Sequence, residues 1–577
     1  MTLSGGERPN HSSGGRGQTL FKYQRSIAES RSARCAASAR RAWRPVGSGA
    51  ALIVAIAFAA CTALPSATSL DRPVSHALAE PESTPLGQAL APLEAAHPQQ
   101  SGYRLLTDGT EALQMRVALA RAATKTLDLQ YYVAAEDSTG KLLLAAAFHA
   151  ADHGARVRVL VDDLNLKDSE RVMAALDMHP TIEVRVFNPF GGAQASFFTR
   201  TTNIFTEIGR FTRRMHNKAM IADNEVAIVG GRNVGDEYFS ASPTVQFRDL
   251  DALVAGPIVR DVSASFDAFW NSPESYPLSA LKKHSYAEQD LNTIREALRA
   301  YWRKNADAYG AKPADPTPLA QRIAQVQLPL VWAPAEFDFD SPGKVAAPKD
   351  AYVSPPMQRL VELLHGARHE VLIVSPYFVP HDAGVHALGE LTHRGVRVAV
   401  LTNSMAATDN IAVQAGYSPY RKPLLENGAE LYEYRPQPGD RDEEHEGYRS
   451  RASLHVKAYV IDRSTLVIGS MNFDPRSAHL NTELVLVIHS ARLADQVAAL
   501  FDRAIAPSTS YRVRLATPVE TAQLRAIGAP VSGLVWTGEE PGNGGPYLAN
   551  WSLDPGAGVV RNMLTGLFLL LPVDSQL

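Results

Sequence analysis

One short pattern occurs twice in this 577-residue chain and constrains its fold more than any other feature. Both copies have the form H-x-K-x4-D-x6-G-[GS]-x-N, and apolar residues follow the aspartate in each. The polar positions are His216, Lys218, Asp223 and Asn233 in the first copy, and His455, Lys457, Asp462 and Asn472 in the second. Because the copies lie far apart, we expect two copies of one domain and not a solenoid of short repeats.

Strand-like and helix-like stretches alternate around each copy in the same order. A β-like run, an amphipathic helix that closes at a glycine, and another β-like run follow one another twice. These runs occupy 126–134, 139–154 and 155–163, and then 370–380, 383–395 and 396–404. The residues YYV at 131–133 are aligned with YFV at 377–379. The order predicts an α/β protein with two tandem domains, each a mixed β-sheet flanked by helices.

The predicted organisation divides the chain into six parts. A targeting segment and a tether precede the first domain, a linker with one helix joins it to the second domain, and an extension follows. The boundaries are 1–61, 62–100, 101–276, 277–345, 346–515 and 516–577. The tether is rich in Pro, Ser, Thr and Ala without helical or strand periodicity, which is typical of a flexible connection.

The N-terminal segment has the features of an export signal. Six arginines from Arg25 to Arg44 precede the apolar run ALIVAIAFAAC, which is too short to cross a bilayer and ends at Cys61. FAAC resembles a bacterial lipobox, which would lipidate Cys61, although Phe58 stands where an aliphatic residue is usual. Arg40 and Arg41 also fit twin-arginine export. We therefore expect a protein of the bacterial cell envelope, associated with the inner membrane or anchored as a lipoprotein.

The composition argues against several kinds of site. The formal net charge is −3, so no global field attracts polyanions and no nucleic-acid partner is expected. The two cysteines, Cys35 and Cys61, cannot form a disulfide framework or a cysteine-based zinc site. The patterns G-x-x-x-x-G-K-[ST] and H-E-x-x-H do not occur, so neither a P-loop ATPase nor a zinc peptidase is expected.

The histidine and lysine of each copy stand two residues apart in an extended segment, so their side chains share one face. If the copies pair around a pseudo-twofold axis, two imidazoles and two ammonium groups converge on one active site. Such a site suits a phosphodiester: the lysines stabilise the phosphate charge, one histidine attacks phosphorus and the other protonates the leaving alkoxide. Because the lysines supply the positive charge, no metal or other cofactor is expected.

The two patterns resemble the HKD signatures of the phospholipase D superfamily, over about residues 100 to 515. This resemblance implies that His216 is the nucleophile and His455 the general acid and base, although a nearly symmetric site can work in either direction. Asn233 and Asn472 are expected to bond phosphate oxygens. The two aspartates that complete the signatures lie beyond the catalytic edge and are expected to fix the local backbone.

A carboxylate is expected to hold the second ring nitrogen of each histidine, because an unheld imidazole can adopt the wrong tautomer. In the second copy the superfamily pattern gives this role to Glu483. In the first copy Asp249 and Asp251 are both available, and Asp249 resembles the counterpart. The alternative is that these acids are ordinary solvated residues at strand ends.

Several stretches resemble bacterial cardiolipin synthases of the C type more closely. They are RRMHNKAMIADNEVAIVGGRNVGDEYF, FNPF, SPYFVP, LTNSMAATDNIAVQAGY and GSMNFDPRSAHLNTE. The resemblance implies transfer of a phosphatidyl group to a glycerol hydroxyl of phosphatidylglycerol, with phosphatidylethanolamine or a second phosphatidylglycerol as donor. Alternatives with the same residues are a phospholipase D, in which water is the acceptor, and a superfamily nuclease, which the net charge does not favour.

Two further segments suggest a lipid surface as partner. Between Phe187 and Met215, phenylalanines alternate with arginines, which suits a membrane interface, an active-site flap or stacking on bases. Those residues are Phe190, Phe197, Phe198, Phe205, Phe211, Arg200, Arg210, Arg213 and Arg214. The apolar stretch from Met563 to Leu571 is too short to span a bilayer and is expected either to dock into the fold or to lie in the interface.

Overall fold

The computed structural model describes residues 70–165, 170–190, 212–281, 288–312, 315–348, 351–436, 451–528, 531–542 and 545–556. The chain divides into the compact units Met1–Ala57 and Phe58–Leu577, and all described residues belong to the second unit. The predicted export signal and Cys61 therefore lie outside the described residues. None of the described helices is both long enough and apolar enough to cross a membrane.

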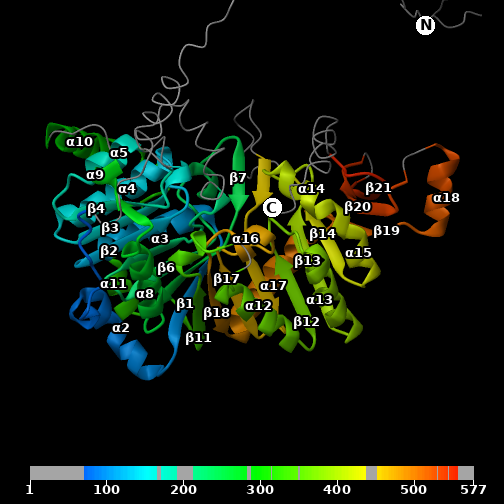
Figure 1. The fold of residues 1–577 in the computed structure, drawn as a ribbon, viewed down its shortest axis with the longest axis horizontal. Coiled ribbons are helices and arrows are strands. Elements are labelled where there is room, and N and C mark those ends of the chain that lie inside the picture. Colours follow the sequence, from blue (N-terminus) through cyan, green and yellow to red (C-terminus); the bar gives the residue numbers. More distant parts are fainter. Residues whose placement is uncertain are drawn as a thin grey trace, which may run out of the picture. The chain divides into compact units, whose positions relative to one another are not determined.

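The first lobe contains a mixed sheet of nine strands in the order β10-β1-β8-β6-β5-β2-β3-β4-β9. Figure 1 labels β1, β2, β3, β4 and β6 of this sheet. It contains the parallel run β2-β3-β4, and β5, the middle strand of the sheet, joins β2 antiparallel. The strand bounds are β1 Ser101–Leu106, β2 Thr126–Tyr131, β3 Arg156–Asp162, β4 Ile182–Phe187, β5 Ala219–Ala222, β6 Val226–Gly230, β8 Asp251–Ala255, β9 Ser275–Pro277 and β10 Val331–Ala333.

The second lobe repeats this plan with ten strands in the order β11-β18-β17-β16-β12-β13-β14-β19-β20-β21. Here β12, β13 and β14 are parallel, and β16 joins β12 antiparallel. The strand bounds are β11 Ala335–Phe339, β12 Glu370–Val374, β13 Arg397–Asn403, β14 Glu430–Tyr434, β16 Ala458–Ile461, β17 Thr465–Gly469, β18 Leu484–His489, β19 Ser510–Leu515, β20 Leu534–Glu540 and β21 Tyr547–Trp551. The predicted α/β class with two mixed sheets is confirmed.

Helices flank both sheets (Figure 1). In the first lobe they are η2 Pro81–Ser83, α2 Pro85–Ala96, α3 Gly109–Ala122, α4 Ser138–Asp152, η3 Asp163–Asn165, α5 Glu170–Leu176, η4 Asp236–Tyr238, α8 Val259–Trp270, α9 Leu278–Leu281, α10 Glu288–Asn305 and α11 Leu319–Ala324. In the second lobe they are η5 Pro342–Val345, α12 Pro355–Gly366, α13 His381–His393, α14 Ile411–Tyr417, η6 Ser418–Tyr420, α15 Arg421–Glu426, α16 Pro475–His479, α17 Ala491–Ala504 and α18 Pro518–Ala526.

The two lobes share a central apolar core. Ala227 and Val229 of β6 lie in one buried cluster with Leu466 and Ile468 of β17. The intervening Ile228 belongs instead to the outer core of the first lobe, because successive side chains of a strand point to opposite faces. Both motif hairpins are therefore buried on two sides, which explains why their strands are continuous apolar runs.

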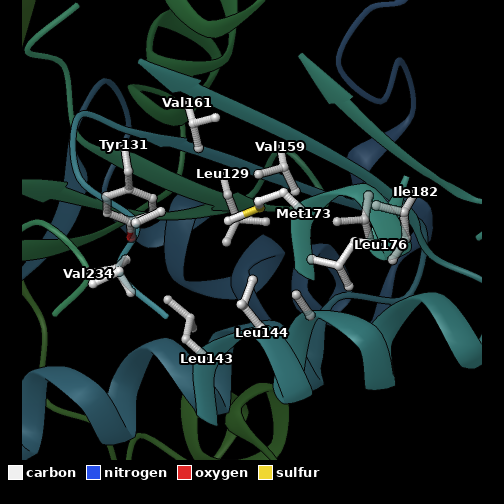
Figure 2. A pocket seen from close by; sticks show the side chains of 14 residues that line it. Leu129, Tyr131, Leu143, Leu144, Val159, Val161, Met173, Leu176, Ile182 and Val234 are labelled. Carbon is white, nitrogen blue, oxygen red and sulfur yellow. The ribbon is translucent and has the colours of Figure 1, made fainter. Parts of the chain in front are cut away.

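The outer core of the first lobe is densely packed. Figure 2 shows apolar side chains from β2, β3, α4 and α5 meeting there, among them Leu129, Leu144 and Met173. The space they leave is about 20 Å³, close to the volume needed for one water molecule. This space belongs to the core and cannot admit a substrate.

Strand register corrects one detail of the predicted repeat. The backbone N–H of Asp223 donates to Thr126, and that of Asp462 donates to Glu370, so these two strand starts are equivalent. The bridges Ala134–Val234 and Phe378–Phe473 extend the same equivalence. The alignment of YYV with YFV is thus wrong by two residues, and Val133 is the counterpart of Tyr377. The apolar tripeptides misled the alignment because their similarity carries no register.

Residues 62–100, predicted as a tether, contain a helix that packs on the first lobe. Thr84 caps the first turn of α2 by accepting from the N–H of Gly87, and Pro85 fits the first helical position. Leu86 and Leu90, one turn apart, are fully buried in the first-lobe core. Upstream, Arg72 donates to the carbonyls of residues 272, 273 and 275. The prediction of a structureless connection is therefore wrong for the described part of this segment.

The predicted linker, residues 277–345, supplies an edge strand to each sheet. Within it, β10 pairs with β1 and β11 pairs with β18, while α10 packs on α4. The described part of the extension adds β20 and β21 to the second sheet. Residues Met563–Leu571 lie outside the described residues, and the domain boundaries themselves stay a prediction.

The role of α2 can be tested by Leu90→Ala. Removal of this buried side chain leaves a cavity, and we expect the free energy of unfolding to fall by about 2–5 kcal/mol. Urea unfolding followed by circular dichroism measures the change. Val74→Ala is the control, because Val74 is 70% exposed and should cost almost nothing. Equal stability of the two variants would mean that α2 is not part of the core.

Candidate active site

Each copy of the motif forms the same structure, an entry segment followed by a β-hairpin. His216 and Lys218 immediately precede β5, and His455 and Lys457 immediately precede β16. All four side chains are buried. The local conformation follows from the apolar strands, which enter the sheet and leave the preceding polar residues at its end.

The motif glycines allow the hairpin to approach the neighbouring strand closely. A Cβ atom on Gly469 would lie 2.1 Å from the carbonyl oxygen of Leu484, and one on Gly230 would lie 2.5 Å from the Cα of Asp251. No larger residue fits at these distances. The glycines thereby hold the second hairpin strand against β8 or β18, directly beside the carboxylate-bearing segments.

The motif aspartates fix the backbone. Asp223 and Asp462 adopt left-handed conformations with φ of 52° and 50°. The carboxylate of Asp223 accepts from the N–H groups of residues 124, 125 and 126. That of Asp462 accepts from those of residues 368, 369 and 370. Each aspartate thus ties its hairpin turn to the start of the central strand, away from the histidines.

The histidines are held by carboxylates from the opposite lobe. His216 Nδ1 lies 2.9 Å from Glu483 Oε2, and His455 Nδ1 lies 2.6 Å from Asp249 Oδ2. Because an ionised carboxylate only accepts, each Nδ1 carries the hydrogen and leaves Nε2 with a lone pair. The carboxylate of Glu483 also accepts from the hydroxyls of Ser470 and Ser477.

Backbone hydrogen bonds reinforce this crosswise arrangement. The N–H of His216 donates to the carbonyl of Thr482, the residue before Glu483, at 3.0 Å. The N–H of His455 donates to the carbonyl of Arg248, the residue before Asp249, at 2.7 Å. Two short strands, β7 Val245–Arg248 and β15 Arg451–Leu454, form a parallel pair between the lobes at this place. Each histidine is therefore positioned by the other lobe through main chain and side chain together.

The two lysines are buried cations next to the histidines. Lys218 Nζ and Lys457 Nζ each donate to the carbonyl of the histidine two residues earlier, at 2.6 Å. Lys457 Nζ also lies 3.1 Å from His455 Nε2. Burial lowers the pKa of Lys218 well below its ordinary value and lowers the pKa of Lys457 to about 8. A bound anion would relieve this cost, since it compensates the buried charge.

The pKa values of the two histidines and of the two acids that hold them are all lowered. Burial lowers the pKa of His216 to about 4, and Glu483 opposes that fall; the pKa of His455 is lowered as well, mainly by burial. Burial alone would raise the pKa of Glu483 and Asp249, but the facing histidines bring both below the ordinary value. Burial therefore favours neutral imidazoles beside ionised carboxylates, and a neutral imidazole is the form that acts as a nucleophile.

Other predicted site residues have structural partners. Asp251 binds Arg116 and Arg232 in ion pairs of 2.9 and 3.1 Å, so of the two candidate acids only Asp249 reaches a histidine. Asn233 donates to the hydroxyl of Tyr238 and accepts from a backbone N–H, so a bond to phosphate requires it to exchange a partner. The buried Oδ1 of Asn472 has no hydrogen-bond partner within the part of the chain that the structure describes.

The structure adds residues that sequence reasoning missed. Tyr132 packs edge-on against His216, and Tyr238 packs edge-on against His455, at 5.3 and 5.2 Å between ring centroids. Ser477 binds Glu483 as described above. Tyr238 and Ser477 each lie five residues after the motif asparagine, so comparison of the two copies beyond that asparagine would have found both.

The segment between Phe187 and Met215 is described only at its ends. Arg214 is buried, pairs with Asp162 at 3.0 Å and lies over the ring of Phe190. Arg213 donates to backbone carbonyls of residues 345 and 347. These two arginines hold the fold together, which contradicts their predicted place at a lipid interface. Phe197, Phe198, Phe205, Phe211, Arg200 and Arg210 lie outside the described residues.

Among the described residues, no group of three or more His, Cys, Asp or Glu side chains could hold a metal ion.

Comparison with known proteins gives consistent similarities. The family described as "Cardiolipin synthase, PLD-like domain" matches residues 117–270 and 360–505. Cardiolipin synthase C of Escherichia coli (strain K12) is 39% identical over 417 residues, which cover 71% of this chain and 86% of that protein. Cardiolipin synthase A of Pseudomonas entomophila (strain L48) is 28% identical, over 68% of this chain and 66% of that protein. The crystal structure of phosphatidylserine synthase from Haemophilus influenzae Rd KW20 has a TM-score of 0.49 and 14% identity, covering 74% and 92% of the two chains.

The crosswise pairing can be tested by Glu483→Gln and Asp249→Asn. Because Glu483 raises the pKa of His216, its neutralisation should lower the titration point of His216 and leave that of His455 nearly unchanged. Asp249→Asn should do the reverse. NMR titration of labelled histidines measures both, and Glu390→Gln on the exposed face of α13 is the control. A shift of the histidine in the same lobe would contradict the pairing.

Lys457 provides a test by pH dependence of stability. Its pKa is about 8 in the folded protein against an ordinary 10.5, so protonation of this buried amine destabilises the folded state. That cost is fully present below pH 8 and disappears as the pH rises toward 10.5. Wild-type protein should therefore gain stability relative to Lys457→Met between about pH 7 and about pH 10. Urea unfolding of both proteins checks this, and a constant difference would count against a buried cation.

Proposed function

Since the chain belongs to the PLD-like cardiolipin synthase family, we propose that it transfers a phosphatidyl group between phospholipids and makes cardiolipin from phosphatidylglycerol. The observation that carries the proposal is the pair of histidines, each held by a carboxylate of the opposite lobe and each beside a buried lysine. In-line displacement at phosphorus needs one group on each side, and this site has two equivalent halves. The second phospholipid, the donor, is phosphatidylethanolamine or another phosphatidylglycerol.

In the proposed first step, Nε2 of His216 attacks phosphorus of the donor lipid. The bond between phosphorus and the headgroup oxygen breaks, and His455, which takes up a proton from solvent when the anionic phosphate binds, gives that proton to the oxygen. Lys218 and Lys457 stabilise the charge on the non-bridging oxygens, and the arriving anion raises their pKa toward full protonation. Glu483 stabilises the positive imidazole ring of the phosphohistidine, as a carboxylate does for a catalytic imidazolium.

In the proposed second step, His455 accepts the proton of the incoming glycerol hydroxyl. The hydroxyl oxygen then bonds to phosphorus and the bond to His216 breaks, which restores both histidines. Asp249 holds His455 in one tautomer during both steps. Because the two lysines supply the positive charge, the scheme uses no metal.

Membrane association belongs to the proposal. The substrates are bilayer lipids, and the chain begins with an arginine-rich, apolar segment that fits export or lipid anchoring at Cys61. We place the protein in the bacterial cell envelope, with its site open to a phospholipid surface. Water in place of glycerol would give phosphatidic acid through the same residues, so product analysis separates a transferase from a phospholipase D.

The reaction is tested with purified protein in phosphatidylglycerol vesicles, with and without phosphatidylethanolamine. We expect cardiolipin from wild type and a loss of activity of at least about 1,000-fold in His216→Ala and His455→Ala, since each histidine serves both steps. His386→Ala is the control, because His386 lies on the exposed side of α13. Phosphatidic acid as the sole product would contradict the transferase.

The covalent label distinguishes the roles of the histidines. We expect the acid-labile phosphatidyl group on His216 in protein quenched during turnover, and no label in His216→Ala. Mass spectrometry of the labelled peptide identifies the residue. A label on His455 would reverse the assignment of nucleophile and acid.

A further inference from the structure

A loop of the second lobe is fixed directly beside His455. Strand β13 ends at Asn403, whose side chain donates to the carbonyl of Leu454 and accepts from its N–H, both at 2.9 Å. Leu454 immediately precedes His455. The residues after Asn403 therefore begin at a defined place next to the proposed acid and base, and the residues from Ser404 to Thr408 are buried.

Asp409 is the residue at which this loop becomes exposed. Thr408 and Asn410 bind each other across it, the hydroxyl of Thr408 accepting from the N–H of Asn410 at 3.2 Å. The carboxylate of Asp409 accepts from the hydroxyl of Tyr377 at 2.7 Å. An aspartate on a fixed turn, with one oxygen held by a tyrosine, presents its other oxygen in a defined direction.

Tyr377 is itself tied to the second motif. The hydroxyl of Ser375 donates to the carbonyl of Tyr377 and accepts from the N–H of Phe473. The N–H of Val379 donates to the carbonyl of Phe473 at 2.8 Å. Phe473 directly follows the motif residue Asn472. The pair is thus held to the half of the site that contains His455 in two ways. Asn403 fixes the loop that leads to Asp409, and Phe473 fixes the segment that contains Tyr377.

Electrostatics agrees with this placement. The charge of Asp409 acts on His455 and Lys457, opposing the fall that burial causes in the pKa of each. It also raises the pKa of Tyr238, whose ring packs on His455, after the larger effect of burial. Asp409 is therefore an exposed anion close to the acid and base, in a site whose lysines otherwise attract anions.

The pair breaks the symmetry of the site. By strand register the counterpart of Tyr377 in the first lobe is Val133, which has no hydroxyl to hold a carboxylate. The substrate is asymmetric in the same sense: one ester oxygen of its phosphate bears a diacylglycerol and the other bears a small polar headgroup. A polar, hydroxyl-accepting group on the His455 side matches the headgroup.

We propose that Asp409, held by Tyr377, binds the hydroxyl-bearing headgroup of the acceptor phosphatidylglycerol and directs its reacting hydroxyl to His455. The inference rests on the proposed function. The carboxylate accepts from one glycerol hydroxyl, while the other loses its proton to His455, bonds to phosphorus and releases His216. Water has no second hydroxyl for Asp409 to hold, so this contact favours the lipid alcohol over water at the same intermediate.

The decisive quantity is the ratio of cardiolipin to phosphatidic acid formed in phosphatidylglycerol vesicles. Both products arise from one phosphohistidine, so their ratio does not depend on how much active enzyme is present. We expect Asp409→Asn to lower the ratio about tenfold, the effect of one charge-assisted hydrogen bond. Tyr377→Phe should lower it by less, because the carboxylate stays but is no longer held. Asp495→Asn on the exposed face of α17 is the control and should keep the wild-type ratio.

The outcomes separate the two proposals. Wild type that makes neither product contradicts the proposed function, whereas an unchanged ratio in an active Asp409→Asn contradicts only the subsite. A second arm adds phosphatidylethanolamine, whose ammonium group could also pair with a carboxylate. Selective loss of phosphatidylethanolamine turnover, with the ratio in pure phosphatidylglycerol unchanged, would overturn the acceptor assignment and place a donor ammonium at Asp409.

Discussion

The site depends on two histidine–carboxylate pairs that cross between the lobes. Glu483 of the second lobe holds His216 of the first, and Asp249 of the first holds His455 of the second. Among the described residues, neither motif histidine is held by an acid of its own lobe, so each half of the site requires the other. The shared apolar core fixes the lobes, and the crosswise pairs convert that fixed geometry into defined imidazole tautomers.

Burial of the lysines and histidines lowers the stability of the fold but strengthens the interactions of these groups with a bound phosphate. Two lysines and two histidines stand close together in a poorly solvated space, and their lowered pKa values record the cost of that arrangement. The same low solvation strengthens every interaction with a bound phosphate, since charges attract more strongly where water is excluded. The fold supports such a site because glycines, buried apolar strands and the two backbone-binding aspartates hold the hairpins from outside it.

Much of this arrangement could be predicted from the sequence, because the two copies of the motif agree in spacing and in the elements around them. The α/β class, the two mixed sheets and the equivalence of the two motif hairpins follow from periodicity and repeat. Three features could not be predicted. Helix α2 lies in a segment rich in proline and alanine with no clear helical periodicity. Two of its leucines are buried, but this becomes apparent only when the first-lobe core is known. Strands β10 and β11 lie at sheet edges, where a short run has no periodicity to recognise. The two-residue error at Val133 and Tyr377 arose because apolar similarity does not encode register.

The sequence by itself determined which chemical groups the site contains: the two motif histidines, the two motif lysines and the acids that follow each motif. It also determined that the strands next to them are apolar and buried. Only the tertiary structure decided which acid holds which histidine, that Asp251 pairs with two arginines, and that the loop before Asp409 is fixed to Leu454, the residue before His455. The physical reason is the range of the interactions. Strand and helix patterns arise from neighbours in the chain, whereas a hydrogen bond between residues 216 and 483 exists only after two separate sheets have packed together.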